Sequence, residues 1–172
     1  MDIYQIQDDF EHYQSILTLT DDDFFLNDEV KVIENWKIPI WQHQPSLSKK
    51  HRKNQKTDND ASCYHIGHLI MKEKIAEKMQ KELAVSVQLL PITVISSPEK
   101  FVFVNVLSKI NAINEEGLSI EESIDRMNNK KVIFNANNIG NQILFRDDIY
   151  VSFYFCTDRF IEWIHKNNIK GL

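Results

Sequence analysis

The sequence is poor in glycine, proline and cysteine, and it has no long apolar run. Four glycines and four prolines in 172 residues argue against a flexible linker protein. Its two cysteines, Cys63 and Cys156, are too few and too far apart for a disulfide framework or a closed zinc site, so we expect reduced thiols. No apolar run reaches the roughly 18 residues of a membrane span, and the N-terminus lacks the basic and apolar regions of a signal peptide. We therefore expect a cytoplasmic protein that does not enter a membrane.

Motifs of the common enzyme classes are also missing. The chain has no glycine-rich phosphate loop, no Gly-x-Ser-x-Gly elbow and no His-Glu-x-x-His pair. The paired acids Asp147-Asp148 and Glu121-Glu122 are typical of a turn and a helix start. We expect no catalytic residue, no cofactor and no metal, although an active site assembled from distant residues would leave no local motif.

Apolar residues are plentiful enough for a substantial core. They make up 42% of the chain, and aromatic residues make up 10%. This length and composition predict a single domain spanning residues 1–172. The order of apolar runs predicts an α+β fold, in which a central mixed, largely antiparallel sheet is combined with several short amphipathic helices.

Negative charge is concentrated at the N-terminal end. The net charge is -5, but residues 1–35 hold ten acidic side chains against Lys31 alone, and the remainder is net positive. A local acidic surface attracts basic partners and raises association rates. We expect the partner-binding residues to lie here, and they are Asp21, Asp22, Asp23, Asp28 and Glu29. A calcium loop is disfavoured because its ligand alternation and turn glycine are missing.

Two polar clusters offer alternatives to that interpretation. Residues 42–62 are predicted to form an exposed loop, and its basic run Lys49 to Lys53 could contact phosphate, although no aromatic residue is interleaved for base stacking. Cys63, His65 and His68 are potential metal ligands, but on one strand His68 would point away from the other two. We expect a solvated charge run and structural or surface histidines.

Several segments have clear secondary-structure patterns. Strands are predicted at residues 2–6, at 30–41 as an edge strand broken by Pro39, at 85–95, at 101–107 and at 131–135. The strands at 85–95 and 101–107 are apolar at nearly every position, so we expect both at the sheet centre. Helices are predicted at 69–83, with Ile75, Met79 and Leu83 on one face, and after Ser119, which forms a capping box with Glu122.

The C-terminal stretch, residues 142–172, has the densest aromatic content. It predicts a hairpin that turns at 146–148, followed by a helix with Thr157 as N-cap and Phe160, Trp163 and Ile164 on its buried side. Residues 71–80 and 156–165 resemble each other as strand-to-helix junctions. This echo predicts two copies of one strand-helix unit in a single sheet.

The order of these motifs resembles a known family. The VNVL of residues 104–107, the LFR of 144–146 and the FCTDRFIEWI of 155–164 are similar to the immunity proteins of bacterial polymorphic toxin systems, in the group typified by a Myxococcus protein. The resemblance implies a cytoplasmic protein that neutralises a cognate toxin, with no catalytic residue. Asn105 and Arg146 would satisfy buried backbone groups, and Thr157 would cap a helix.

Three functional hypotheses therefore follow from the sequence. The leading one is stoichiometric inhibition of a toxin, and a basic nuclease would fit the acidic surface; no nucleic acid or membrane partner is expected. The second is a nucleic-acid or metal-binding module that uses Lys49 to Lys53 with Cys63, His65 and His68. The third is a structural subunit of a larger assembly.

Overall fold

The computed structural model describes residues 1–19, 31–64, 68–95, 97–113, 118–119, 121–122, 125–126, 129 and 132–172. The strands are β1 (Ile3–Gln5), β2 (Ser15–Thr18), β3 (Ile40–Gln44), β4 (Ala61–Tyr64), β5 (His68–Lys72), β6 (Val87–Val94), β7 (Phe101–Val106), β8 (Lys109–Ile110), β9 (Leu144–Asp147) and β10 (Phe155–Thr157). The helices are α1 (Lys49–Arg52), α2 (Glu73–Leu83), α4 (Ala136–Ile139) and α5 (Asp158–Lys166). This mixture confirms the predicted α+β class. Within the described residues, no helix is long and apolar enough to cross a membrane.

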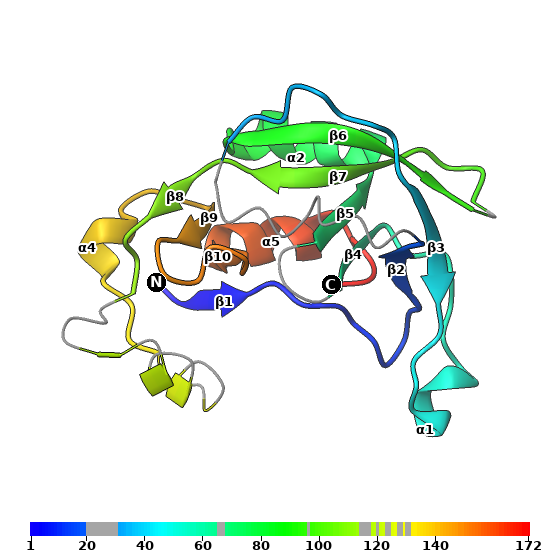
Figure 1. Cartoon of the computed structure of the whole chain (residues 1–172), viewed down its shortest axis with the longest axis horizontal. Helices are drawn as coiled ribbons and strands as arrows, with labels where there is room; N and C mark the ends of the chain where they lie inside the picture. Colours follow the sequence, from blue (N-terminus) through cyan, green and yellow to red (C-terminus); the bar gives the residue numbers. More distant parts are fainter. Residues whose placement is uncertain are drawn as a thin grey trace.

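The strands form two sheets (Figure 1). One has the order β1-β10-β9-β8, and the other has the order β2-β3-β6-β7-β5-β4. The β3–β6 and β8–β9 pairs are parallel, and the other pairs are antiparallel, so the predicted mixed and largely antiparallel pairing is confirmed.

Strand β7 lies at the centre of the larger sheet and is buried along its whole length. Because side chains alternate along a strand, Phe101 and Phe103 pack into a cluster on one face, while Val102 and Val104 pack on the other. Trp36 covers the first face by stacking on Phe103, with the ring centroids 6.1 Å apart. The prediction of a centrally buried strand is confirmed for β7, whereas β6 keeps some exposed positions.

The two predicted strand-to-helix junctions are present. Strand β5 leads directly into α2, and β10 leads into α5. The expectation that both units share one sheet is wrong, because β5 belongs to the larger sheet and β10 to the smaller. Both helices nevertheless supply side chains to the same apolar cluster. The Trp163 indole N–H also donates to Glu82 Oε2 at 2.8 Å, which joins α5 to α2.

Residues 30–62 differ most from their predicted structure. The strand begins after Pro39 rather than before it, and β3 lies between β2 and β6 instead of at an edge. Residues 42–62 are not one exposed loop, because they contain the end of β3, the helix α1 and the start of β4. Trp41 is fully buried, and Asn59 is also buried. The predicted strand at 30–41 overlaps β3 only at Ile40 and Trp41, because the five residues of β3 are too few for an apolar–polar alternation to define its bounds.

In the connection from β8 to β9, the described residues also form less strand than predicted. Of the predicted strand at 131–135, residues 132–135 are described, and Phe134 forms an isolated bridge with Ile113; the short helix α4 follows. The capping box is confirmed, because the Glu122 amide donates to Ser119 Oγ at 3.2 Å and the Ser119 amide donates to Glu122 Oε2 at 2.8 Å.

The C-terminal residues are attached to β4. The amides of Asp60 and Ala61 both donate to the carbonyl of Lys170, at 2.9 and 3.0 Å. Gly171 follows with φ of +105°, and a Cβ added there would lie 2.1 Å from the Ala61 carbonyl oxygen. Only glycine fits this backbone conformation and this close approach.

Candidate functional site

A buried polar cluster joins the two sheets. Arg146 on β9 donates from Nη2 to Asn105 Oδ1 at 2.7 Å and to the Tyr154 hydroxyl at 2.8 Å. Its guanidinium carbon also lies 4.7 Å from the centroid of the Tyr154 ring. Burial raises the pKa of Tyr154 to about 12, although the positive charge of Arg146 opposes that rise. Arg146 therefore binds side chains rather than the predicted backbone groups, whereas Asn105 does donate to the Lys31 carbonyl at 3.0 Å.

Asp147, the next residue, is buried and accepts four backbone hydrogen bonds. Its Oδ2 accepts from the amides of Ala112 and Ile113, both at 2.9 Å. Its Oδ1 accepts from Ile149 at 2.7 Å and Tyr150 at 3.2 Å. The interpretation of Asp147-Asp148 as a simple turn is therefore wrong for Asp147, which ends β9 and joins the segment after β8 to the segment after β9.

Helix α5 begins where predicted, but the expected capping hydrogen bond is not formed. Thr157 occupies the N-cap position, yet its hydroxyl makes no capping hydrogen bond and is buried without a partner among the described residues. Phe160, Trp163 and Ile164 are all buried as predicted, and the first two rings stack at 6.3 Å. These side chains therefore belong to the apolar core that supports the fold.

The predicted docking and metal-binding residues fall largely outside the described part of the chain. Asp21, Asp22, Asp23, Asp28, Glu29, His65 and the side chain of His68 all lie outside it. Cys63 is described and buried, and burial raises the pKa of its thiol, so the thiol stays protonated near neutral pH. Among the described residues, no group of three potential metal ligands comes together.

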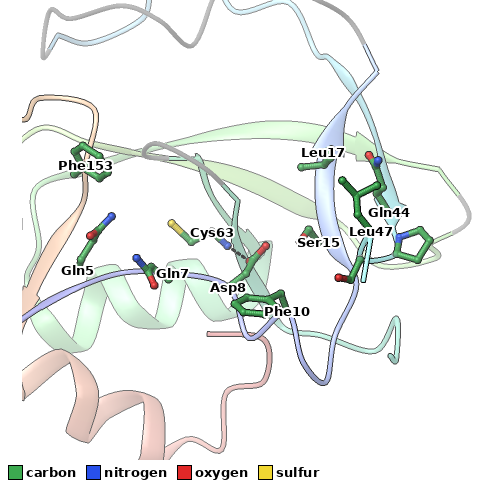
Figure 2. A pocket seen from close by; sticks show the side chains of 12 residues that line it. Gln5, Gln7, Asp8, Phe10, Ser15, Leu17, Gln44, Leu47, Cys63 and Phe153 are labelled. Atoms are coloured by element: carbon green, nitrogen blue, oxygen red, sulfur yellow. Dashed lines mark hydrogen bonds between the residues drawn. The ribbon is translucent and has the colours of Figure 1, made fainter. Parts of the chain in front are cut away.

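An open recess of about 490 Å³ lies between the segment after β1, strand β2 and the connection from β3 to α1. Figure 2 shows Asp8 and Cys63 deep in it, with Phe10 and Leu47 nearer the rim. Phe10 is 52% exposed and Leu47 is 85% exposed. The full lining is Gln5, Gln7, Asp8, Phe10, Ser15, Leu17, Gln44, Pro45, Ser46, Leu47, Cys63 and Phe153. We call it the Asp8 recess.

Asp8 is a partly satisfied carboxylate. Its Oδ1 accepts from the Ser62 hydroxyl at 2.9 Å and from the Cys63 amide, whereas Oδ2 is buried without a hydrogen-bond partner in the described residues. Burial raises the pKa of Asp8, and hydrogen bonds from Ser15, Cys63 and Ser62 oppose the rise. The recess therefore combines apolar walls with an acidic group that ionises reluctantly.

A second, more polar recess of about 440 Å³ lies beside β3 and the turn that follows β6. His43 lines it and contacts Asn59 Oδ1 through Nε2 at 3.0 Å. Burial lowers the pKa of His43, so its imidazole is neutral near neutral pH. Lys72 in the same lining is paired with Asp60 at 2.9 Å. The described partner of His43 is an amide rather than a carboxylate, so the described residues of this recess do not form a histidine–carboxylate pair.

The site residues that sequence reasoning missed have weak local signals. Tyr154 joins Arg146 and Asn105 only because the loop 148–154 folds back under β7. Asp8 lies in an irregular connection, and Leu47 comes two residues after Pro45 in the predicted loop. Contacts between residues more than 40 apart position Asp8 and Phe10, because Ser62 donates to the Asp8 carboxylate and Gln55 donates to the Phe10 carbonyl.

The described residues combine a scaffold held together by buried hydrogen bonds with a recess that has exposed apolar side chains. Such an arrangement can bind a side chain of another molecule. A scan against protein-family models finds no match for this chain, and a search of curated proteins finds no significant match either. The function is therefore argued from the sequence and the geometry alone.

Proposed function

We propose that this chain is an immunity protein, which binds a cognate bacterial toxin in the cytoplasm and neutralises it by stoichiometric protein contact. The observation that carries the proposal is the Asp8 recess with Phe10 and Leu47 at its rim. Leu47 is the most exposed of the large apolar side chains in the part of the chain that the structure describes. Protein interfaces commonly combine apolar anchors, pockets that receive them and a polar rim.

The sequence resemblance supports the same function through different residues. Its motifs contain Asn105, Arg146, Phe160, Trp163 and Ile164, which are all buried. They build the body that holds the loops in place. Recognition then belongs to the surface, where the Asp8 recess is available for a partner.

Acidic residues add a second, electrostatic part to the proposal. Asp21, Asp22, Asp23, Asp28 and Glu29 supply five negative charges within nine positions. Carboxylates can occupy a basic site on a toxin, and against a nuclease they would replace the phosphates of the substrate. Inhibition of this kind requires no catalytic step and no cofactor.

The test requires a candidate toxin, and the proposal predicts that a secreted toxin with a variable C-terminal domain is encoded immediately beside this gene. The purified toxin domain and this chain are mixed, and complex formation is measured by calorimetry and size-exclusion chromatography. We expect a one-to-one complex and loss of toxin activity in proportion to the amount added. A toxin domain that stays fully active and elutes separately at micromolar concentrations would contradict the proposal. An unrelated toxin domain serves as the control.

A further inference from the structure

The exposed lysines of α1 have no ion-pair partner among the described residues. Some lysines elsewhere are paired, for example Lys109 with Asp148 at 3.2 Å and Lys170 with Asp58 at 2.8 Å. Lys49 and Lys50 are exposed and have no carboxylate within salt-bridge distance among the described residues. The helix buries none of its side chains. Within the described residues, the charges of Lys49 and Lys50 are therefore not compensated by a carboxylate.

This helix is nevertheless held firmly against the chain. Gln55 accepts from the Ser46 amide at 2.8 Å and donates to the carbonyls of Phe10 and Tyr13, the latter at 2.9 Å. Arg52 Nε donates to the Ser46 carbonyl at 3.1 Å. These contacts hold the segment that contains α1 next to the segment that carries Phe10.

The same contacts place α1 beside the Asp8 recess. The Phe10 ring, which lines the recess, meets the His51 ring of α1 edge to face, with centroids 5.9 Å apart. Ser46 and Leu47 line the recess, and Ser48 is the N-cap of α1. Figure 1 shows α1 at the far end of β3, away from α2 and α5. We call Phe10, Leu47 and residues 49–53 the α1 surface.

We propose that the α1 surface docks an acidic segment of a protein, with one apolar anchor residue of that segment in the adjoining Asp8 recess. The ligand's carboxylates lie along Lys49, Lys50 and Arg52, while its anchor contacts Phe10 and Leu47. Charge complementarity selects the flanking residues, and the recess selects the anchor. The identification of the partner as a toxin rests on the proposed function. The α1 surface is distinct from the acidic run at 21–29.

A protein segment fits this surface better than RNA does. The net charge of -5 repels a long polyanion, whereas a short acidic segment contacts α1 alone. Three acidic residues lie nearby: Asp8 has its pKa raised by burial, Asp9 contacts His12 at 2.8 Å, and Glu11 is exposed. They limit the acidic segment to the α1 side of the recess. The apolar rim also favours an aliphatic or aromatic side chain over a phosphate backbone.

The experiment selects short random peptides displayed on phage against the immobilised full-length chain. We expect enriched sequences that combine acidic residues with one large apolar residue. Binding of a synthetic peptide with the enriched sequence should fall about tenfold in the double variant Lys49→Glu/Lys50→Glu and about as much in Leu47→Ala. The matched control Lys74→Glu/Lys81→Glu makes the same charge change on α2, and it should bind the peptide as the wild type does.

Enrichment of basic or purely apolar peptides, or no enrichment, would overturn the α1 surface. So would tighter binding of a fluorescent uridine-rich single-stranded RNA than of any selected peptide. The toxin domain separates this inference from the proposed function. If acidic peptides bind at α1 and the toxin does not bind, the surface stands and the toxin assignment falls. If the toxin binds the Lys49→Glu/Lys50→Glu variant and the wild type equally, the toxin assignment stands and the surface falls.

Discussion

Charged side chains are buried in the cluster at the end of β9, whereas they are exposed on the α1 surface. In the first, Arg146 is buried between Asn105 and Tyr154, and Asp147 accepts four backbone amides. In the second, Lys49 and Lys50 are exposed without a carboxylate partner in the described chain, beside the exposed side chains of Phe10 and Leu47.

This difference separates stability from recognition. Buried polar groups whose partners are all internal are costly to change, because each lost partner leaves a desolvated group behind. Exposed charges contribute little to folding, so their arrangement is free to serve a partner. Substitutions at the end of β9 should therefore change unfolding, and substitutions on the α1 surface should change binding.

The largest expected effect is loss of the fold when residues 157–172 are removed. The deletion takes away Phe160, Trp163 and Ile164 from the main apolar cluster, and it also removes the contacts of Lys170 with β4. Burial of three such side chains is worth roughly 5 kcal/mol or more, which is comparable to the stability of a whole domain. Thermal denaturation followed by circular dichroism tests this. A truncated chain that still melts cooperatively would contradict it.

Asp147→Ala should follow in size, with a loss of at least about 3 kcal/mol in the free energy of unfolding. The substitution leaves four backbone amides without their acceptor. Asp148→Ala is the matched control, because Asp148 forms an exposed pair with Lys109 and its loss should cost less than about 0.5 kcal/mol. Urea denaturation of both variants measures the difference. Equal losses of stability in the two variants would contradict the distinction between the buried carboxylate of Asp147 and the exposed carboxylate of Asp148.

Asp8 lies between these extremes, and its effect should depend on pH. Burial raises its pKa in the folded state above the unfolded value, so its contribution to stability is present at low pH and is lost as pH rises through the raised pKa. Asp8→Asn keeps an acceptor oxygen for Ser62 and Cys63 but cannot ionise. We expect the stability of Asp8→Asn relative to the wild type to increase between about pH 3 and about pH 7.

Asp58 supplies a control of opposite sign for that measurement. The hydrogen bond from Lys170 lowers the pKa of Asp58, so its contribution is present above the unfolded pKa and is lost as pH falls through the lowered value. Asp58→Asn should therefore lose stability relative to the wild type over the same rise in pH. Urea denaturation across the pH series compares the two variants. A parallel trend for both would show that the half-satisfied state of Asp8 has no influence.

The smallest effect on folding is expected from the acidic run. Replacing Asp21, Asp22 and Asp23 with Asn should leave the midpoint of thermal unfolding nearly unchanged, but it should slow association with the toxin about tenfold at low salt. Stopped-flow measurements at several salt concentrations test this. Unchanged rates and an unchanged salt dependence would exclude these residues from recognition.

The elements predicted best from the sequence are those with long, regular patterns. Helix α2, helix α5 and the β6–β7 pair have apolar residues at regular spacing, and their packing agrees with that spacing. The capping box at Ser119 was also predictable, because its two partners are only three residues apart. In each of these cases, residues close together in the sequence are sufficient to predict the element.

The rest depends on contacts between distant residues. Strand β3 is only five residues long and is positioned by pairing with β2 and β6. Asp147 resembles a turn residue until the amides of Ala112 and Ile113 approach it from another strand connection. The candidate site was missed for the same reason, since the Asp8 recess exists only where β4, β2 and the chain before α1 converge.

Inhibition of the predicted cognate toxin tests the central claim most directly. Toxin activity is measured while the wild-type chain, Asp148→Ala and Lys49→Glu/Lys50→Glu are each added in increasing amounts. We expect wild type and Asp148→Ala to abolish activity at one equivalent, and the α1 variant to require about tenfold more. A toxin that retains full activity at a large excess of the wild-type chain would contradict the account.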